Sequence, residues 1–473
     1  MGNGIFKVSN LKKTYYYLKK NGLKNAYYAA LERIMREKNE DYRYEMLMPD
    51  QKTLKQQKEI GKTYPYTFSI LVPTYETKEE YLREMADSVL QQTYGKFKLV
   101  IADASRSEAV RNVMDTYSDK RIQYIRLTEN NGISENTNAA LKMAEGDYIA
   151  LLDHDDVLTP DALFEMAKAI KEKEKNGNMV WMLYSDEDKG NGDLTQFYEP
   201  HFKPDLNMDL LMSNNYICHF LVMKREVLQE LKLRKEYDGA QDYDLVLRAV
   251  EKLIYEKKTG REAIVHIPKV LYHWRCHTAS TAENPESKRY AYEAGKHALE
   301  DLMRRRGWKG SVSHTLHLGF YRIDYEKDIF SQRKEVGVIG GKLFDRRERI
   351  IGGIYDHRGK CPYLGLGKNF SGYMHRAVLA QEAYAVDIRC MRVRKELRTV
   401  FEEFFGVPYC ETKKNGKYMF DYKKLSKRIP DGKEGEKEWI RCSMEFAKKV
   451  RRAGYILVWM PDYGNRIDGR NGE

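Results

Sequence analysis

Short apolar runs alternate with amphipathic stretches along the chain, and the alternation begins at residue 68. Residues 68–72 read Phe-Ser-Ile-Leu-Val and are followed by Pro73, a pattern typical of a buried parallel strand. Residues 79–92 then have a helical period. Their apolar face consists of Leu82, Met85, Ala86, Val89 and Leu90. Together the two stretches predict a strand followed by a helix.

The same alternation repeats three times. It predicts strands at 98–102, 122–127 and 148–152, and helices at 108–117, 134–144 and 160–173. Ser134 is expected to cap the second of these helices, and Thr159 with Pro160 to form the N-cap and first residue of the third. This order implies an α/β domain with a mostly parallel, Rossmann-like sheet covered by helices on both faces. Ligands of such sheets bind beyond the carboxyl ends of the strands.

Polar residues follow each of the four predicted strands. They are Thr74, Tyr75 and Glu76 after the first, Asp103 and Ser105 after the second, Asn130, Asn131 and Gly132 after the third, and Asp153, His154, Asp155 and Asp156 after the fourth. Carboxylates at one sheet edge repel one another unless a cation or hydrogen bonds offset the charge. We therefore expect a divalent cation there. Helix capping is the alternative for this turn, and we assign it to Asp156.

Six motifs in this order resemble the inverting nucleotide-sugar transferases of glycosyltransferase family 2, which have a GT-A fold. They are Ser-Ile-Leu-Val-Pro-Thr-Tyr at 69–75, Asp103, Asn-Gly-Ile-Ser-Glu-Asn-Thr-Asn-Ala-Ala at 131–140, Gly-Asp-Tyr-Ile-Ala-Leu-Leu-Asp-His-Asp-Asp at 146–156, Gln-Asp-Tyr-Asp-Leu at 241–245 and Trp-Arg-Cys-His-Thr-Ala-Ser at 274–280. Each motif alone is weak, and the specificity lies in their number and order.

The resemblance implies a nucleotide-diphosphate sugar as the donor and Mg²⁺ or Mn²⁺ as the cofactor. Asp103 would hydrogen-bond the base, and Asp153 would face the ribose or the metal. Asp155 would coordinate the metal, which bridges the diphosphate. The other residues that the resemblance assigns to nucleotide binding are Pro73, Thr74, Tyr75, Glu76, Asn131, Gly132 and Asn138.

Asp242 occupies the position of the family's general base, at the start of a predicted helix. Inversion needs one carboxylate that takes the proton of the acceptor hydroxyl as it attacks the anomeric carbon. Many relatives have Glu-Asp here, whereas this chain has Gln241 before Asp242. Asp244 is the rival candidate, and a purely structural N-cap is the alternative role for Asp242.

Further residues are assigned to the cleft by the same resemblance. His277 would complete the metal site, with His273 as an alternative, and Arg275 could meet a phosphate oxygen. The donor and acceptor cleft would be lined by Asp186, His219, Gln241, Trp274 and Arg275, with ordinary loop and strand-end roles as alternatives for Asp186 and His219.

The chain continues beyond this domain. Residues 336–473 resemble the distal half of a second transferase domain that lacks the nucleotide aspartate and the Asp-x-Asp motif. Ser443 stands where its catalytic aspartate would be, so we expect a non-catalytic, degenerate GT-A-like half that serves packing, homodimer formation or acceptor binding. The stretch 411–438 is predicted to be a long exposed loop. The predicted domains are 1–64, a basic helical segment; 65–310, catalytic; 311–335, a linker; and 336–473, the degenerate half.

Composition limits the remaining choices. The net charge is +12, and lysines interleaved with tyrosines near the N-terminus suit contact with an anionic membrane surface, and equally a solvated helix. No nucleic-acid-binding motif accompanies the basic bias, so nucleic acid is not expected as a partner. The six cysteines lie far apart, and no signal-peptide-like or membrane-spanning apolar stretch is present. We therefore expect a cytoplasmic protein that is peripheral at the inner face of the cytoplasmic membrane.

The sequence thus predicts an inverting glycosyltransferase that acts on a glycan or lipid-linked acceptor in cell-surface polysaccharide synthesis. A nucleotidyltransferase is disfavoured because residues 73–78 lack a glycine-rich phosphate loop. A non-catalytic carbohydrate-binding or scaffold subunit of a polysaccharide assembly complex is the alternative.

Overall fold

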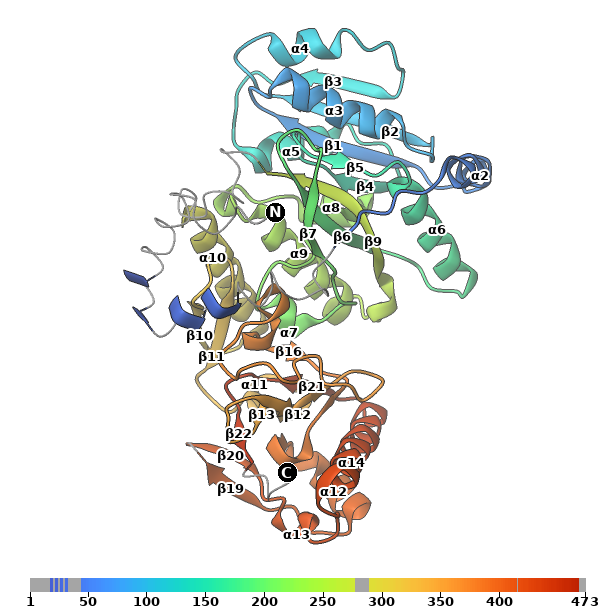
Figure 1. Ribbon diagram of the computed structural model, residues 1–473. Coiled ribbons are helices and arrows are strands. Elements are labelled where there is room, and N and C mark those ends of the chain that lie inside the picture. Colours follow the sequence, from blue (N-terminus) through green and yellow to red (C-terminus); the bar gives the residue numbers. More distant parts are fainter. Residues whose placement is uncertain are drawn as a thin grey trace. The chain divides into compact units, whose positions relative to one another are not determined.

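The structure is a computed structural model that describes residues 18–19, 22–23, 26–28, 30–32, 44–276, 289–414 and 416–467. Within these residues the chain forms two compact units (Figure 1). The first unit comprises residues 43–206 and 215–305, and the second comprises 207–214 and 306–473 with the described residues before 43. None of the described helices combines the length and apolarity needed to cross a bilayer. The domain boundaries given above remain predictions.

Nine strands of the described chain form one mixed sheet in the first unit. Its parallel half contains the four predicted strands, because β1 pairs in parallel with β2 and β4, and β2 pairs in parallel with β3. The other half adds antiparallel pairs of β8 with β4 and β6, while β6 and β9 run parallel. The α/β fold class with a GT-A-like sheet is confirmed. The strand order is β3 (Ile122–Arg126), β2 (Phe97–Asp103), β1 (Phe68–Thr74), β4 (Tyr148–Leu151), β8 (Leu221–Lys224), β6 (Met182–Gly190), β9 (Ile264–Arg275) and β5 (Val157–Leu158), with β7 (Phe197–His201) beside β6.

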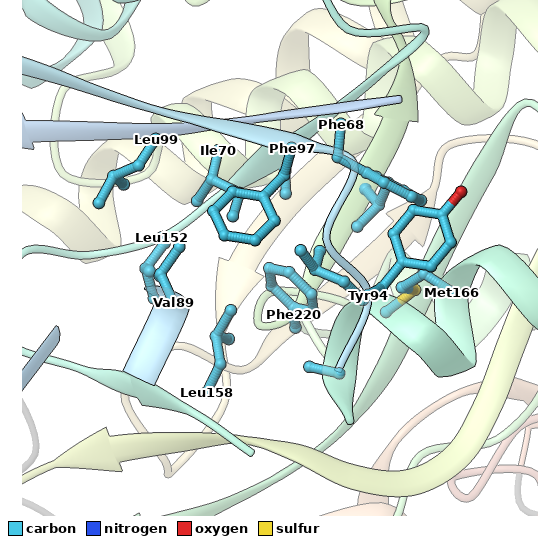
Figure 2. Packing of buried hydrophobic residues seen from close by; sticks show 14 of the residues in the cluster. Phe68, Ile70, Val89, Tyr94, Phe97, Leu99, Leu152, Leu158, Met166 and Phe220 are labelled. Carbon is cyan, nitrogen blue, oxygen red and sulfur yellow. The ribbon is translucent and has the colours of Figure 1, made fainter. Parts of the chain in front are cut away.

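Helices cover both faces of this sheet, as predicted. Phe68, Ile70 and Val72 of β1 pack into a hydrophobic core with α3 (Glu79–Leu90), α4 (Ala109–Met114) and α6 (Ala162–Lys175) (Figure 2). Successive strand residues point to opposite faces, so Leu71 faces the other side. There α5 (Ile133–Lys142) contacts β1 and β2. The remaining helices of the unit are α2 (Gln51–Lys62), α8 (Arg225–Leu231), α9 (Gln241–Glu251) and α10 (Arg289–Arg306), with short turns at Lys235–Tyr237, Lys252–Glu256 and Arg261–Ala263.

Two predicted helix starts are wrong. The N-cap of α5 is Gly132, whose φ is 96°, and Ser134 lies inside the first turn with its hydroxyl 2.5 Å from Asp238 Oδ1. The N-cap of α6 is Asp161, and the Thr159 hydroxyl donates to Asp161 Oδ1 at 2.9 Å. In both cases the hydroxyl bonds to an aspartate side chain instead of the free backbone N–H groups of the helix.

The second unit contains a four-stranded sheet, counted over its described residues. β12 runs parallel to β21, and the edge strands β18 and β16 are antiparallel to them. One face packs against α12 and α14 through Val338 and Leu457, while Ile339 and Val458 belong to a smaller cluster on the other face. The order is β16 (Gln381–Glu382), β21 (Ile456–Trp459), β12 (Val336–Gly340) and β18 (Met391–Val393), and the helices are α12 (Arg398–Phe405) and α14 (Gly432–Arg452).

The prediction of a long loop at 411–438 is wrong. The segment forms a hairpin, a short helix and the first two turns of α14, and it buries Phe420 and Leu425. Gly416, with φ 79°, lies between the two hairpin strands. The elements here are β19 (Glu411–Lys414), β20 (Lys417–Phe420) and α13 (Lys423–Ser426). Smaller elements elsewhere in the unit are α7 (Met208–Leu211), β10 (Gly310–His314), β11 (Tyr321–Tyr325), α11 (Ile329–Gln332), β13 (Leu343–Phe344), β14 (Ile350–Gly352), β15 (Ile354–Tyr355), β17 (Ala385–Val386) and β22 (Asn465–Arg466).

Candidate active site

A small cavity opens beyond the carboxyl ends of β1 and β4 in the first unit. Its volume is about 70 Å³, and both Asp153 and Asp242 line it. Asp153 follows β4, and Asp242 is the second residue of α9. The two aspartates therefore share one cleft, at the sheet edge where α/β proteins bind ligands. The other lining residues are Leu71, Pro73, Ile133, Thr137, Leu151, Leu152, Cys218, His219, Leu221, Leu233 and Gln241.

The Asp242 carboxylate is held by two donors from the segment before β8. Asn215 Nδ2 and the Cys218 thiol each donate to Asp242 Oδ2 at 2.8 Å. The N-cap of α9 is Ala240 and Asp242 lies inside the helix, so the N-cap role considered for Asp242 is wrong. Burial and the negative charge of Asp242 raise the pKa of Cys218 to about 12, which keeps the thiol protonated as a donor.

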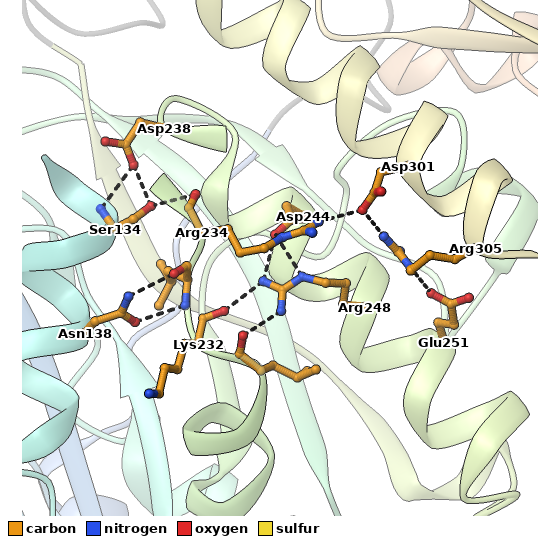
Figure 3. Close-up of polar contacts among 12 residues, drawn as sticks. Ser134, Asn138, Lys232, Arg234, Asp238, Asp244, Arg248, Glu251, Asp301 and Arg305 are labelled. Atoms are coloured by element: carbon orange, nitrogen blue, oxygen red, sulfur yellow. Dashed lines mark hydrogen bonds and ion pairs between the residues drawn. The ribbon is translucent and has the colours of Figure 1, made fainter. Parts of the chain in front are cut away.

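Asp244 is committed to a different set of contacts (Figure 3). Its side chain is 1% exposed and accepts hydrogen bonds from Arg248 Nε at 2.9 Å and from Arg234 Nε at 3.0 Å. Arg234 also bonds to Asp301 Oδ2 at 2.7 Å. This buried network fixes the first turns of α9 against α10, so Asp244 supports the helix while Asp242 faces the cavity.

Acidic residues and one histidine gather beside Asp153. Ligand atoms of Asp153, Asp156 and His219 lie within 4.8 Å of one another. Asp156 is buried and accepts from the Tyr272 hydroxyl at 2.5 Å and from Arg275 N at 2.7 Å, so its predicted capping role is wrong. Burial, and then the charges of Asp155 and Asp153, raise the pKa of Asp156 well above its usual range. Partial desolvation also raises the pKa of Asp153, whose side chain is 48% exposed, against the opposing charge of His219. A cation would relieve this crowding of like charges.

His219 connects this corner to Glu187 of β6. Its ring stacks on Tyr272 with centroids 4.6 Å apart, and its Nδ1 lies 3.1 Å from Glu187 Oε2. Its Nε2 lies 3.3 Å from Cys218 Sγ and 3.8 Å from Asp153 Oδ2. Burial alone would lower the pKa of His219, but the contacts with Cys218 and Glu187 raise it well above its usual range. Because Nδ1 contacts Glu187, the ring nitrogen that faces Asp153 is Nε2.

Four other residues were predicted to contact the metal or a phosphate, and three of them are described by the structure. Asp155 sits beside the cluster, and its backbone carbonyl accepts from Arg275 Nε at 2.5 Å. The Arg275 side chain is fully buried and pairs with Glu84 at 2.6 Å, so it does not reach the cavity. His273, also buried, lies 2.5 Å from Asp188 through Nδ1. His277 lies outside the described residues.

Asp103, the residue predicted to bind the base, is fully buried at the end of β2. It accepts from the Tyr124 hydroxyl at 2.7 Å, from Arg126 Nη1 at 2.9 Å and from Ser105 N at 2.9 Å. Thr74 Oγ1 lies 3.3 Å from its Oδ1. The structure thus makes Asp103 the centre of a hydrogen-bond network that joins three adjacent strand ends.

Glu76 organises the neighbouring loop. Its φ is 47°, and its carboxylate accepts from Arg106 N at 2.7 Å and from the Ser107 hydroxyl at 2.6 Å. These hydrogen bonds, that of the Ser107 hydroxyl first, lower the pKa of Glu76. Tyr75 is 42% exposed beside this loop, and Pro73 lines the cavity, so the first strand presents both residues toward solvent-accessible space.

The remaining predicted residues divide between open and structural positions. Asn138 exchanges two hydrogen bonds with the Leu233 backbone, at 2.8 and 3.0 Å. Asp186 accepts from Lys203 N at 2.7 Å and pairs with His266 at 2.8 Å, and it does not line the cavity. Gln241 lines the cavity. Trp274 is half-buried, with its ring centroid 5.8 Å from that of His219. Before α5, Asn131 is exposed and Gly132 is half-buried.

Sequence reasoning missed three residues near the cleft, and it misassigned a fourth, Asp156. Asn215 and Cys218 contact Asp242, while Asp156 and Glu187 surround His219. The contacts of Asn215, Cys218 and Glu187 join positions 24 to 32 residues apart, and Asp156 lies 63 positions from His219, so no local pattern reports them. Each of these residues lies in the same short segment as a predicted site residue. Their neighbours in the motifs were therefore the signal that could have indicated them.

Comparison with known proteins gives a consistent result. The family model of Glycosyl transferase family 2 matches residues 69–232. An uncharacterized protein of Sinorhizobium fredii is 39% identical over 50% of this chain and 25% of its own length. The O-antigen biosynthesis protein RfbC of Myxococcus xanthus is 32% identical over 54% of this chain and 19% of its own length. The chain therefore spans a quarter or less of these relatives. The crystal structure of S. aureus TarS 1–349 in complex with UDP is 20% identical, with 51% of this chain and 71% of that chain covered and a TM-score of 0.37.

Proposed function

Because residues 69–232 form a glycosyltransferase family 2 domain with a GT-A-like sheet, we propose that this protein transfers a sugar, with inversion, from a nucleotide-diphosphate donor to a glycan or lipid-linked acceptor. We further propose that the product is a cell-surface polysaccharide, in line with the O-antigen relative. The observation that carries the proposal is the shared cavity of Asp153 and Asp242 beyond the ends of β1 and β4.

Asp242 is the proposed general base. Its two hydrogen-bond donors among the described residues, Asn215 and Cys218, both bind Oδ2. Oδ1 is then the oxygen that accepts the proton of the acceptor hydroxyl as the hydroxyl attacks the anomeric carbon. The same two contacts fix the χ angles of Asp242, which favours one orientation of the base toward the reacting atoms.

A divalent cation, Mg²⁺ or Mn²⁺, is the proposed cofactor at the Asp-x-Asp corner. Carboxylate and imidazole donors suit such ions, and the raised pKa values of Asp153 and Asp156 fit carboxylates that await a positive charge. Asp153 and Asp155 are the proposed ligands, with Asp156 and His219 as further candidates. When bound, the cation would neutralise charge on the departing nucleotide diphosphate.

The alternative function is a non-catalytic carbohydrate-binding or scaffold subunit. Asp153 and Asp242 would then share a cleft that does not turn over. A transferase and a scaffold subunit differ in whether the cleft binds a nucleotide donor with the help of a metal ion. A scaffold has no need of a cation that binds the diphosphate. Binding of the nucleotide is therefore the first quantity to measure.

Calorimetric titration of the full chain with UDP and with GDP, each with and without Mn²⁺, tests the proposal. We expect one of the nucleotides to bind only in the presence of Mn²⁺, and Asp153→Asn to weaken that binding by at least roughly tenfold. Glu145→Gln, a change of an exposed carboxylate before β4, serves as the matched control. Binding of neither nucleotide, or metal-independent binding unaffected by Asp153→Asn, would contradict the proposed donor site.

A further inference from the structure

A second, much larger cavity lies within the second unit. Its volume is about 940 Å³, which is ample for a ligand of several sugar-sized rings. It lies at the carboxyl ends of the parallel strands β12 and β21, since Lys342 and Asp462 line it and follow those strands by two and three residues. Ile339 and Val458 form part of its floor, on the sheet face opposite α14. The topology is thus the one at which open α/β sheets bind ligands.

Lys342 is a buried cation that lines this cavity. Its side chain is 6% exposed, and its ammonium group donates to the Lys368 carbonyl at 2.6 Å. No carboxylate of the described residues forms an ion pair with it. Burial lowers the pKa of Lys342 to about 8, although the more distant charges of Asp462 and Glu32 act in the opposite direction. An ammonium group has three donors, so a ligand anion is the partner that its position lacks.

The rest of the lining is basic and aromatic. Six lysine or arginine side chains line the cavity against four aspartates. Of these cations, Lys368 and Arg392 also pair with Glu348 and Glu411, which do not line the cavity, whereas no such ion pair of Lys342 is found among the described residues. Two of the cations lie over lining rings, Lys417 over Tyr463 at 5.5 Å and Lys368 over Phe344 at 5.1 Å. Cationic groups beside aromatic faces suit a ligand that combines a negative charge with a sugar ring, because the ring packs on the aromatic face and the anion meets the ammonium groups.

We propose that the cavity of the second unit binds an anionic saccharide, with its phosphate or carboxylate at Lys342 and its ring against Phe344 and Tyr463. The site is independent of the proposed catalytic cleft, which lies in the first unit. In an enzyme that extends a charged polymer, such a site would hold a part of the chain away from the reacting end. The proposal itself requires only the binding.

Methyl NMR of the full chain labelled at methionine tests the proposal, because Met212 and Met460 line the cavity. The probes are glucose 1-phosphate, galacturonic acid, glucose and inorganic phosphate at millimolar concentration. We expect glucose 1-phosphate and galacturonic acid to shift the Met460 signal, which is assigned through Met460→Leu, and glucose to leave it unchanged. The affinities of the two anionic sugars then show whether the site prefers a phosphate or a carboxylate.

The variant Lys342→Gln should weaken the binding of the effective probe by at least roughly tenfold, while Lys433→Gln, a change of an exposed lysine on α14, should not alter it. The methionine spectrum of each variant reports whether it is folded, and Lys417→Gln replaces Lys342→Gln if the latter is not. No shift of Met212 or Met460 with either anionic sugar would overturn the proposal. Equal binding of inorganic phosphate and both sugars would also overturn it, because the saccharide would then contribute nothing.

Discussion

The two neighbouring aspartates of α9 give a sharp contrast between chemistry and packing. Asp242 faces the cavity, whereas Asp244 is 1% exposed between Arg234 and Arg248. The same substitution, aspartate to asparagine, at each position changes one charge and almost no volume. We expect Asp244→Asn to destabilise the first unit and Asp242→Asn to leave its stability unchanged.

The magnitude follows from the contacts. Neutralising Asp244 leaves two arginines, one of them buried, without their main counter-charge, and breaking a buried ion pair in this way costs roughly 3–5 kcal/mol. In a unit of this size each kcal/mol corresponds to roughly 2–4 °C, so the melting temperature should fall by roughly 6–20 °C. Asp242 instead stands near another carboxylate, Asp153, and its neutralisation should change the free energy of unfolding by less than about 1 kcal/mol.

Thermal unfolding followed by circular dichroism and by calorimetry measures both variants beside the wild type. The two units can unfold separately, so the calorimetric trace is resolved into its transitions before the comparison. A loss of stability in Asp242→Asn as large as that in Asp244→Asn would refute the division of roles between the two residues. So would an Asp244→Asn protein as stable as the wild type.

Three further predictions concern other positions. Cys218→Ala removes a hydrogen-bond donor to Asp242 and should lower kcat in a transfer assay by up to roughly tenfold, with an unchanged circular dichroism spectrum. Cys218→Ser keeps a donor and should retain most of the activity. Equal kcat values for the two variants would count against a role for this hydrogen bond. The folded-state pKa of Lys342, about 8, lies below its ordinary value of 10.5, so the free energy of unfolding decreases as the pH falls through about 8. Chemical denaturation should show the wild type gaining up to roughly 3 kcal/mol over Lys342→Met between pH 7 and pH 10. A difference between the two proteins that does not change with pH would refute the cost of burying the charged ammonium group. Gly132→Ala places a Cβ 2.3 Å from Asp238 Oδ2 at a φ of +96° and should lower the melting temperature by several degrees, unlike Gly177→Ala, which has a similar φ and no close neighbour; equal effects would contradict the steric cause.

The sequence predicted the parallel half of the first sheet because its signal is local. The run 68–72 and the helical period of 79–92 each lie within one element, and the structure extends or shortens them by only one or two residues. The antiparallel strands β6 and β8 were not specified, since their pairing joins segments about 40 residues apart. The 411–438 prediction failed because abundant lysine and glycine concealed Phe420 and Leu425, whose burial depends on the rest of the second unit.

The sequence motifs predicted which residues lie near the candidate site. The Asp153 and Asp242 motifs, which are 89 positions apart, do line one cavity. What the sequence could not supply is which polar side chains have other partners. Asn138 bonds to the Leu233 backbone 95 positions away, and Arg275 pairs with Glu84, so their availability to a ligand depends on long-range contacts that no motif contains.

Release of nucleotide from a sugar donor tests the central claim most directly. The full chain is incubated with Mn²⁺, an acceptor glycan and the donor of the nucleotide that binds, and free nucleotide diphosphate is measured over time for the wild type and Asp242→Asn. We predict that the wild type turns over and that Asp242→Asn is at least roughly a hundredfold slower while binding the donor equally well. Equal rates of release by the two proteins would contradict the assignment of Asp242 as the base in this cleft.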